Sequence, residues 1–270
     1  MSRAWPGLGM GTWHMGEGAS SRAAEVAALR LGLDLGMNLV DTAEMYGEGG
    51  AESVVGEAIA GRGGEVVVVS KFYPHHVGRR KLLAACDASL ERLGVDALDL
   101  YLLHWRGSVA LAETVATLED LVAQGKIRRW GVSNFDVADM EELVSVPGGD
   151  KVAANQVLYN LARRGIEFDL LPWCRKRGIR IMAYSPLDEG RLARHPALVS
   201  VATRLGVPPA RAALAWLLRA PDLVVIPKAS KTEHVRENRA ASALVLDDET
   251  LNALEQAFPA PRGKRPLEMI

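Results

Sequence analysis

Short apolar runs alternate with longer amphipathic segments along the chain, and this alternation limits the possible folds more than any other feature. The runs cover residues 8–13, 38–42, 66–71, 98–104, 127–132, 153–157, 180–184 and 223–226. The run at 66–71 opens with consecutive valines, which is typical of a strand buried on both faces. Eight strand–helix units in one chain favour an α/β fold, a closed (β/α)8 TIM barrel with parallel strands.

The amphipathic segments predict the helices of such a barrel. In the first of them, Val26, Leu29 and Leu33 fall on one face at helical spacing. We expect Ser20 and Ser21 to cap this helix and Gly36 to end it. The predicted helices cover residues 20–35, 51–60, 81–93, 109–123, 137–144, 168–177, 196–205, 209–218, 231–241 and 248–258.

An open, doubly wound sheet is the alternative fold. It would normally begin with a phosphate-binding G-x-G-x-x-G between a strand and a helix. Here Gly7 and Gly9 are followed by Thr12 at the last glycine position, and no helix follows at once. We interpret Gly7, Gly9 and Gly11 as a flexible turn and a close approach of the backbone, and we favour the barrel.

Length and composition agree with one enzyme-sized domain spanning residues 1–270. The 32 basic and 33 acidic residues nearly cancel, so we expect neither nucleic acid nor an anionic membrane as a partner. No signal peptide or membrane-spanning run is apparent in the sequence. Cys86 and Cys174 do not make a disulfide scaffold, which favours a reducing, cytoplasmic location.

Four ionisable side chains stand at or just beyond the ends of consecutive predicted strands. Asp41 follows the second strand, Tyr46 lies in the same loop, Lys71 ends the third strand and His104 ends the fourth. Because consecutive strands are neighbours in a barrel and reacting groups sit at their carboxyl ends, we expect these four groups to converge.

These residue types form a proton donor. A free tyrosine has a pKa near 10, and a neighbouring lysine charge lowers it, while Asp41 would hold the lysine charged. His104 could bind a substrate carbonyl or help the proton to move. The set contains no hydride, so it needs a cofactor. The adjacent pair His75 and His76 lacks the spacing of a metal site, and we expect no metal.

Several segments carry a resemblance to a known family. They are GLGMGTW, NLVDTAEMYGEGGAESVVGEAI, VVVVSK, SLERLGVDALDLYLLHW, IRRWGVSNF, NQVLYN, IMAYSPL, and IPKAS followed by HVREN. In this order and over nearly the whole length, the sequence resembles the aldo-keto reductases. It is most similar to bacterial members that reduce small reactive carbonyls such as methylglyoxal or diketogluconate.

The resemblance implies reduction of aldehydes or ketones with NADPH. Tyr46 would be the general acid, Lys71 and Asp41 would tune it, and His104 would position the carbonyl. Trp13 and Trp105, with Tyr46 and His104, would contact the substrate. The implied cofactor contacts are Gly11, Thr12, Trp13, Asp41, Ser133, Asn134, Gln156, Tyr184, Ser185, Pro186, Leu187, Arg191, Ile226, Lys228, Ala229, Ser230, His234, Glu237 and Asn238.

Two positions depart from the family pattern. His234 stands where many relatives carry an arginine that grips the adenosine 2′-phosphate, so NADPH remains the expected cofactor but NADH is possible. Asp188 and Glu189 stand in the loop expected near the pyrophosphate, which they would repel. We therefore expect both acids to point to solvent and Gly190 or Arg191 to lie closer to the phosphates.

Two other functions remain open at this point. Lys71 could form a Schiff base with a carbonyl substrate in a barrel lyase. The chain could also be a nucleotide-binding regulatory protein with slow turnover. The family resemblance further implies a monomer, and the short segment after the last helix is expected to enclose little of the substrate.

Overall fold

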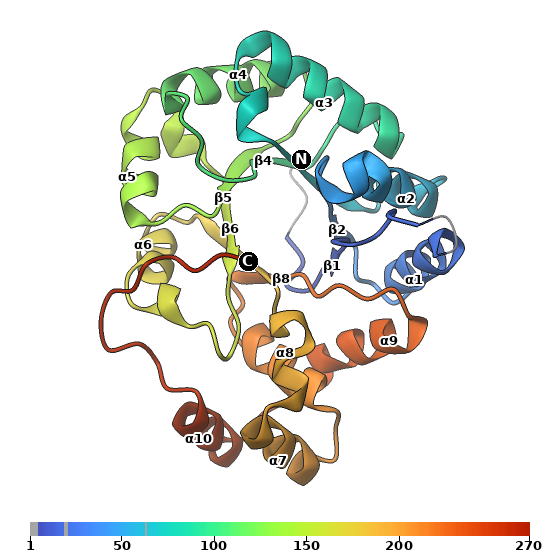
Figure 1. The fold of residues 1–270 in the computed structure, drawn as a ribbon, viewed down its shortest axis with the longest axis vertical. Helices are drawn as coiled ribbons and strands as arrows, with labels where there is room; N and C mark the ends of the chain where they lie inside the picture. Colours follow the sequence, from blue (N-terminus) through green and yellow to red (C-terminus); the bar gives the residue numbers. More distant parts are fainter. Residues whose placement is uncertain (1–4, 19–20, 63) are drawn as a thin grey trace.

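A computed structural model describes residues 5–18, 21–62 and 64–270, and in it the strands form one parallel barrel (Figure 1). The strands follow one another around the sheet in chain order. The backbone beside β1 and β8 closes the ring, because Gly9 donates to the Val225 carbonyl and Val225 donates to the Gly7 carbonyl. The strands are β1 Met10–Gly11, β2 Leu39–Asp41, β3 Val67–Phe72, β4 Leu100–Leu103, β5 Trp130–Ser133, β6 Ala154–Leu158, β7 Arg180–Tyr184 and β8 Leu223–Val225. The predicted TIM barrel is confirmed.

Helices surround this barrel, while α7 lies beside α10 at its outer edge (Figure 1). Their apolar faces pack against the outward-pointing side chains of the strands. These helix and strand residues together form the larger of two hydrophobic clusters among the described residues. The helices are α1 Arg22–Asp34, α2 Gly50–Ile59, α3 Arg79–Leu93, α4 Leu111–Ala123, α5 Val137–Ser145, α6 Leu170–Lys176, α7 Pro196–Leu205, α8 Pro209–Leu218, α9 Thr232–Ala240 and α10 Asp248–Ala257.

The first helix differs from its prediction at one end. Ser20 lies outside the described residues, and the Ser21 hydroxyl donates to the Gly18 carbonyl instead of capping the helix. The Ser21 cap was therefore a wrong prediction. Gly36 does adopt the left-handed conformation after the helix, with φ of +85°, as its position predicts.

The first strand is much shorter than the apolar run that predicted it. Only Met10 and Gly11 pair as a strand, but the chain before them stays close to its neighbours. A Cβ on Gly9 would lie 2.5 Å from a methyl group of Leu39, and one on Gly11 would lie 2.9 Å from the Ile226 carbonyl. The close backbone approach is confirmed, whereas Gly9 and Gly11 lie along the barrel wall rather than in a flexible turn.

The barrel interior is filled by a second apolar cluster. Its members alternate along the strands with the outward-facing residues, as a period of two requires. They are Leu39, Val67, Val69, Leu100, Leu102, Ala154, Met182, Val224 and Ile226. This apolar cluster fills the barrel interior below the carboxyl ends of the strands, so only the rim at those ends is open for a site. No described helix is long and apolar enough to cross a membrane.

Candidate active site

The inward-facing row of several strands continues at the carboxyl ends with a polar residue. Leu39, Val69, Leu102, Ala154 and Met182 belong to the interior cluster. Two positions further on, the same face carries Asp41, Lys71, His104, Gln156 and Tyr184. The pleat of the strands therefore aims these polar groups at the mouth of the barrel.

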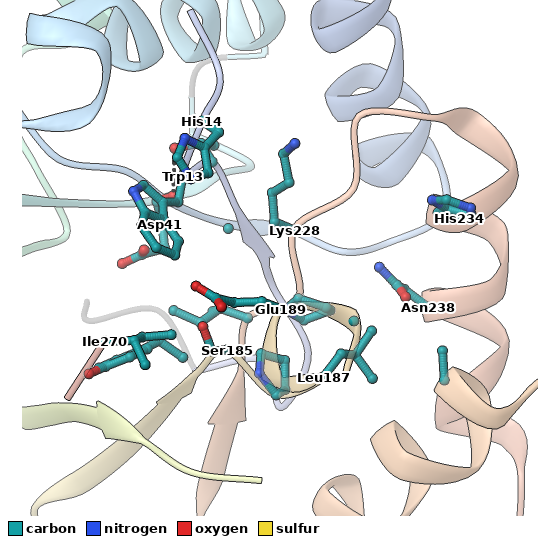
Figure 2. A pocket seen from close by; sticks show the side chains of 18 of the residues that line it. Trp13, His14, Asp41, Ser185, Leu187, Glu189, Lys228, His234, Asn238 and Ile270 are labelled. Carbon is teal, nitrogen blue, oxygen red and sulfur yellow. Dashed lines mark hydrogen bonds between the residues drawn. The ribbon is translucent and has the colours of Figure 1, made fainter. Parts of the chain in front are cut away.

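A cavity of about 790 Å³ opens above this polar layer. Figure 2 shows Trp13, Asp41 and Ile270 on one side of it and Lys228, His234 and Asn238 on the other. We call the part around Asp41, Tyr46, Lys71 and His104 the reaction end. We call the part around Lys228, His234 and Asn238, where the sequence predicted cofactor contacts, the nucleotide end. The predicted site residues that line the cavity are Gly11, Thr12, Trp13, Asp41, Tyr46, His104, Ser133, Asn134, Gln156, Tyr184, Ser185, Pro186, Leu187, Ile226, Lys228, His234, Glu237 and Asn238.

Lys71 lies beneath the cavity floor and is fully buried. Its ammonium group donates to Asp41 Oδ2 at 2.8 Å, to the Thr42 carbonyl at 2.9 Å and to the Tyr46 hydroxyl at 3.1 Å. Burial acts to lower the pKa of Lys71, but Asp41 and Tyr46 outweigh it and the pKa is raised. A charged amine with three acceptors is not a nucleophile, which argues against the Schiff-base hypothesis.

Asp41 is fixed from two further directions. Its Oδ1 accepts from Gln156 Nε2 at 2.7 Å, and its backbone carbonyl accepts from the Thr12 hydroxyl at 3.0 Å. Hydrogen bonds to both carboxylate oxygens hold the charge that stabilises the lysine ammonium. Gln156 therefore already uses its amide nitrogen within the protein.

Tyr46 begins a 3-10 turn, Tyr46–Gly49, just after β2. Burial raises the pKa of Tyr46 and the charge of Lys71 lowers it, with burial the larger effect, so the pKa is raised. The expected influence of the lysine is present but does not prevail. The phenol stays protonated near neutral pH, which is the form that can donate, and Lys71 is placed to stabilise the phenolate left behind.

His104 follows β4 and faces the Tyr46 ring edge-on, with 5.8 Å between ring centroids. Burial and then the Lys71 charge lower the pKa of His104 to about 3. Its buried Nδ1 has no hydrogen-bond partner among the described residues. The neutral ring suits a hydrogen bond to a substrate oxygen, and such a low pKa argues against His104 as a proton carrier.

A hydrogen-bonded rim joins β5 to β7 beside this group. The Tyr184 hydroxyl donates to Asn134 Oδ1 at 2.9 Å, and Asn134 Nδ2 donates to the His104 carbonyl at 3.2 Å. Ser133 donates to the Gln156 carbonyl at 2.9 Å. Asn134 has a φ of +60°, a conformation that asparagine tolerates better than most residues. The rim fixes the orientation of the amide that faces the cavity.

The nucleotide end is open by comparison. Lys228 and His234 are exposed, and the Lys228 ammonium lies 3.5 Å from the Ser230 hydroxyl. Glu237 accepts from two nitrogens of Arg211, at 3.1 and 2.7 Å. The predicted cofactor residues Arg191, Ala229 and Ser230 are not among the residues that line the cavity.

The loop after β7 corrects the prediction for one of its two acids. Asp188 is buried and accepts from Arg191 Nε at 2.8 Å and from Arg163 Nε at 3.5 Å, so it does not point to solvent. The Arg191 hydrogen bond contributes most to a lowered pKa of Asp188. Glu189 is exposed, as expected, and also lines the cavity, as Gly190 does. Arg191 binds Asp188 and lies 2.9 Å from Glu189, and it does not line the cavity. The arginines offset the carboxylate charge that was expected to force both acids outward.

Of the two tryptophans predicted to contact the substrate, only one lines the cavity. Trp13 lines it and stacks on His14, with centroids 4.4 Å apart. Trp105 does not line it and packs edge-on against Tyr73 at 5.8 Å. Ile270 lines the cavity, so the segment after α10 encloses more of it than expected.

The adjacent histidines after β3 behave as side chains of a loop. His76 lies 2.9 Å from Glu44, with His76 Nδ1 facing Glu44 Oε1. Across the described residues, no group of three or more His, Cys, Asp or Glu side chains could hold a metal ion.

Sequence reasoning missed a further set of lining residues. Glu233 could have been found, because it lies one helical turn before Glu237 on the same face of α9. Pro208 and Pro209 mark the start of α8 but carry no chemical signal that they face a cavity. The missed residues are His14, Met45, Glu189, Ala193, Pro208, Pro209, Ala210, Pro227, Glu233 and Ile270.

Comparison with known proteins gives consistent matches over almost the whole chain. The model of the Aldo/keto reductase family matches residues 7–258. The chain is 52% identical to methylglyoxal reductase YeaE of Escherichia coli K12, over 98% of this chain and 95% of that protein. It is 32% identical to an NADH-specific methylglyoxal reductase of the same strain, over 89% of this chain and 91% of that protein.

A solved structure agrees with the sequence matches. A crystal structure of an aldo/keto reductase from Klebsiella pneumoniae in complex with NADP and acetate superposes with a TM-score of 0.97. The two chains share 51% identity over 99% of this chain and 96% of the other.

Proposed function

Because this chain belongs to the aldo/keto reductase family, we propose that it reduces small aldehydes and ketones to alcohols with NADPH, and that methylglyoxal is a representative substrate. The relatives named above support this class of substrate. The observation that carries the assignment is the buried Asp41–Lys71–Tyr46 chain beside a neutral His104 at the floor of a large cavity.

The residues present fit a nicotinamide cofactor. The buried, unpartnered Nδ1 of His104 and the amide of Asn134 offer polar groups at the reaction end. Lys228 offers a cation at the nucleotide end for the adenosine 2′-phosphate. Ser133, Asn134, Gln156 and Tyr184 would hold the nicotinamide, and the loop after β7 would follow the pyrophosphate. When bound, NADPH supplies the hydride that the side chains lack.

The side chains supply the proton and the orientation. His104 holds the carbonyl oxygen by a hydrogen bond, and Tyr46 donates its phenolic proton to that oxygen as negative charge develops there. Lys71 then stabilises the phenolate, because its ammonium already donates to the Tyr46 oxygen. Asp41 and Gln156 keep that ammonium charged and in place.

Use of NADH by this chain depends on what Lys228 and His234 contribute. Lys228 favours NADPH through its charge, while His234 stands where many relatives carry an arginine that would add a second cation. We propose NADPH as the preferred cofactor and NADH as a weaker one.

We propose that the protein is cytoplasmic and monomeric. Both cysteines are free and buried, which fits the reducing cytoplasm. The net charge of –1 gives no attraction for nucleic acid. We propose a monomer, which light scattering coupled to gel filtration would test.

The direct test is consumption of NADPH, followed at 340 nm, with methylglyoxal as substrate and with NADH in a parallel series. We expect turnover with both cofactors and a lower KM for NADPH. Tight NADPH binding without turnover over a broad panel of carbonyls would instead support the regulatory hypothesis. Capture of a substrate on Lys71 by borohydride would support the Schiff-base hypothesis.

A further inference from the structure

The segment of residues 259–270, here called the C-terminal segment, connects α10 to the cavity. Figure 1 shows it in red, passing α6 and returning to the middle of the barrel. Ile270 lines the cavity, and its backbone forms a hydrogen bond with the Tyr184 hydroxyl. The segment is therefore one wall of the reaction end.

Two adjacent arginines after β6 hold the chain just before this segment and again near the end of the segment. Arg164, itself buried, donates to Glu255 at 2.7 Å and to the Phe258 carbonyl. Arg163 donates to Glu268 at 2.6 Å, two residues before Ile270. The path of the wall is set by these contacts rather than by secondary structure.

Arg163 has a second partner that Arg164 lacks. Its Nε also reaches Asp188 at 3.5 Å, in the loop of residues 185–195 that follows β7. We call this the β7 loop, and Ser185 and Glu189 from it line the cavity. One guanidinium group thus joins the loop proposed to follow the cofactor to the wall at the reaction end.

The turn that carries Arg163 is firmly fixed. The buried side-chain oxygen of Asn160 accepts from the backbone of Ala162 at 2.9 Å and of Arg163 at 3.0 Å. Asn160 Nδ2 donates to the Ser185 carbonyl at 2.9 Å. The turn that carries Arg163 and the start of the β7 loop therefore share one anchor, Asn160.

We propose that Arg163 is a positioning residue that couples the two ends of the cavity, so that nucleotide held against the β7 loop orders the C-terminal segment and completes the carbonyl-binding wall. This inference rests on the proposed function, since it needs a nucleotide at the β7 loop. By linkage, an ordered wall must also tighten nucleotide binding by the same factor.

Lys264 provides a matched control on the same segment. Its ammonium lies 3.8 Å from Asp169, which caps α6, and it has no described contact with the β7 loop. Loss of Lys264 should loosen the segment without disconnecting it from the nucleotide. Loss of Arg163 should do both.

The test is hydrogen exchange of residues 259–270 with and without NADPH, for the wild type, Arg163→Gln and Lys264→Gln. Quenching of protein fluorescence reports NADPH binding in each. We expect NADPH to slow exchange in the wild type by about fivefold, the lower range of allosteric coupling. Lys264→Gln should keep this response and Arg163→Gln should lose it while still binding NADPH.

Kinetics separate positioning from a merely structural role. Arg163→Gln should raise the KM for methylglyoxal about fivefold while kcat changes less than about twofold, because only the wall is disturbed. Retention of the NADPH response in Arg163→Gln, or its absence in a wild type that binds NADPH, would overturn the coupling alone. Failure of the wild type to bind NADPH would overturn the proposed function and the coupling with it.

Discussion

The two ends of the cavity are built in opposite ways. At the reaction end, Asp41 and Lys71 are buried and every ammonium proton of Lys71 has an acceptor. At the nucleotide end, Lys228 and His234 are exposed. The reaction end is sensitive to substitution, because removing one partner of a buried ion pair leaves an uncompensated charge in the low-dielectric interior. Removing an exposed cation costs little stability because water fills its place. Residues at the nucleotide end can therefore be substituted without loss of the fold.

The largest expected effect is from Lys71→Met. It removes a buried charge and leaves Asp41 without its ion-pair partner, so we expect a loss of about 3–5 kcal/mol in the free energy of unfolding. Turnover should fall about 10²-fold or more, because the phenolate of Tyr46 loses its stabilising charge. Urea unfolding and NADPH consumption measure these effects. Lys228→Met should change the free energy of unfolding by less than about 0.5 kcal/mol. Equal stability of the two variants would contradict the contrast between the two ends.

A smaller effect is expected at the nucleotide end. Lys228→Met removes an exposed cation proposed to meet the 2′-phosphate, and we expect the Kd for NADPH to rise about tenfold, in the range of one charge-assisted hydrogen bond. The Kd for NADH, which lacks that phosphate, should not change. Titrations followed by fluorescence quenching give both values. Equal weakening for the two cofactors would remove Lys228 from the 2′-phosphate.

His104 sharpens the comparison through pH. Its pKa is lowered to about 3 in the folded chain, whereas an unperturbed histidine has a pKa of about 6.5. Between these values the unfolded chain binds more protons, so this group makes stability fall as pH drops below about 6.5, by up to about 1.4 kcal/mol per pH unit.

Urea unfolding at pH 7.0 and 5.0 tests this dependence in the wild type and in His104→Gln. The variant should lose less stability on acidification than the wild type. An equal loss for wild type and His104→Gln would show that His104 is not held neutral by the fold.

The smallest effect separates the two tryptophans. Trp13 lines the cavity and Trp105 packs beside it against Tyr73. We expect Trp13→Phe to raise the KM for methylglyoxal. Trp105→Phe should change it by less than about twofold, because Trp105 does not line the cavity and phenylalanine keeps an aromatic ring beside His104. Steady-state kinetics of the two variants decide between them. A larger effect at Trp105 would place the substrate carbonyl closer to the loop that follows β4.

The sequence predicted the residues of the reaction end more completely than those of the rest of the site. Strand alternation and the neighbouring of consecutive strands were enough to bring Asp41, Lys71 and His104 to one rim. The net pKa of Tyr46 was out of reach, because it depends on how much burial opposes Lys71, and burial is a property of the packed chain.

The loops show where such reasoning ends. Asp188 is held inward mainly by Arg191, three residues further on, and also by Arg163 across 25 positions, a contact that no local pattern predicts. Ile270 reaches the cavity because Arg163 and Arg164 hold the path before it. In both cases ion pairs, some of them between residues far apart in the sequence, outweigh the expectation that an acid or a terminal segment lies in solvent.

The central claim is that Tyr46 gives the proton while the remainder of the site binds. Tyr46→Phe tests it most directly, with kcat measured by NADPH consumption with methylglyoxal and NADPH binding measured by fluorescence quenching. We expect kcat to fall by about 10²-fold or more, the usual scale of general acid catalysis, with the Kd for NADPH unchanged. Turnover equal to that of the wild type would contradict the assignment of Tyr46 as the proton donor.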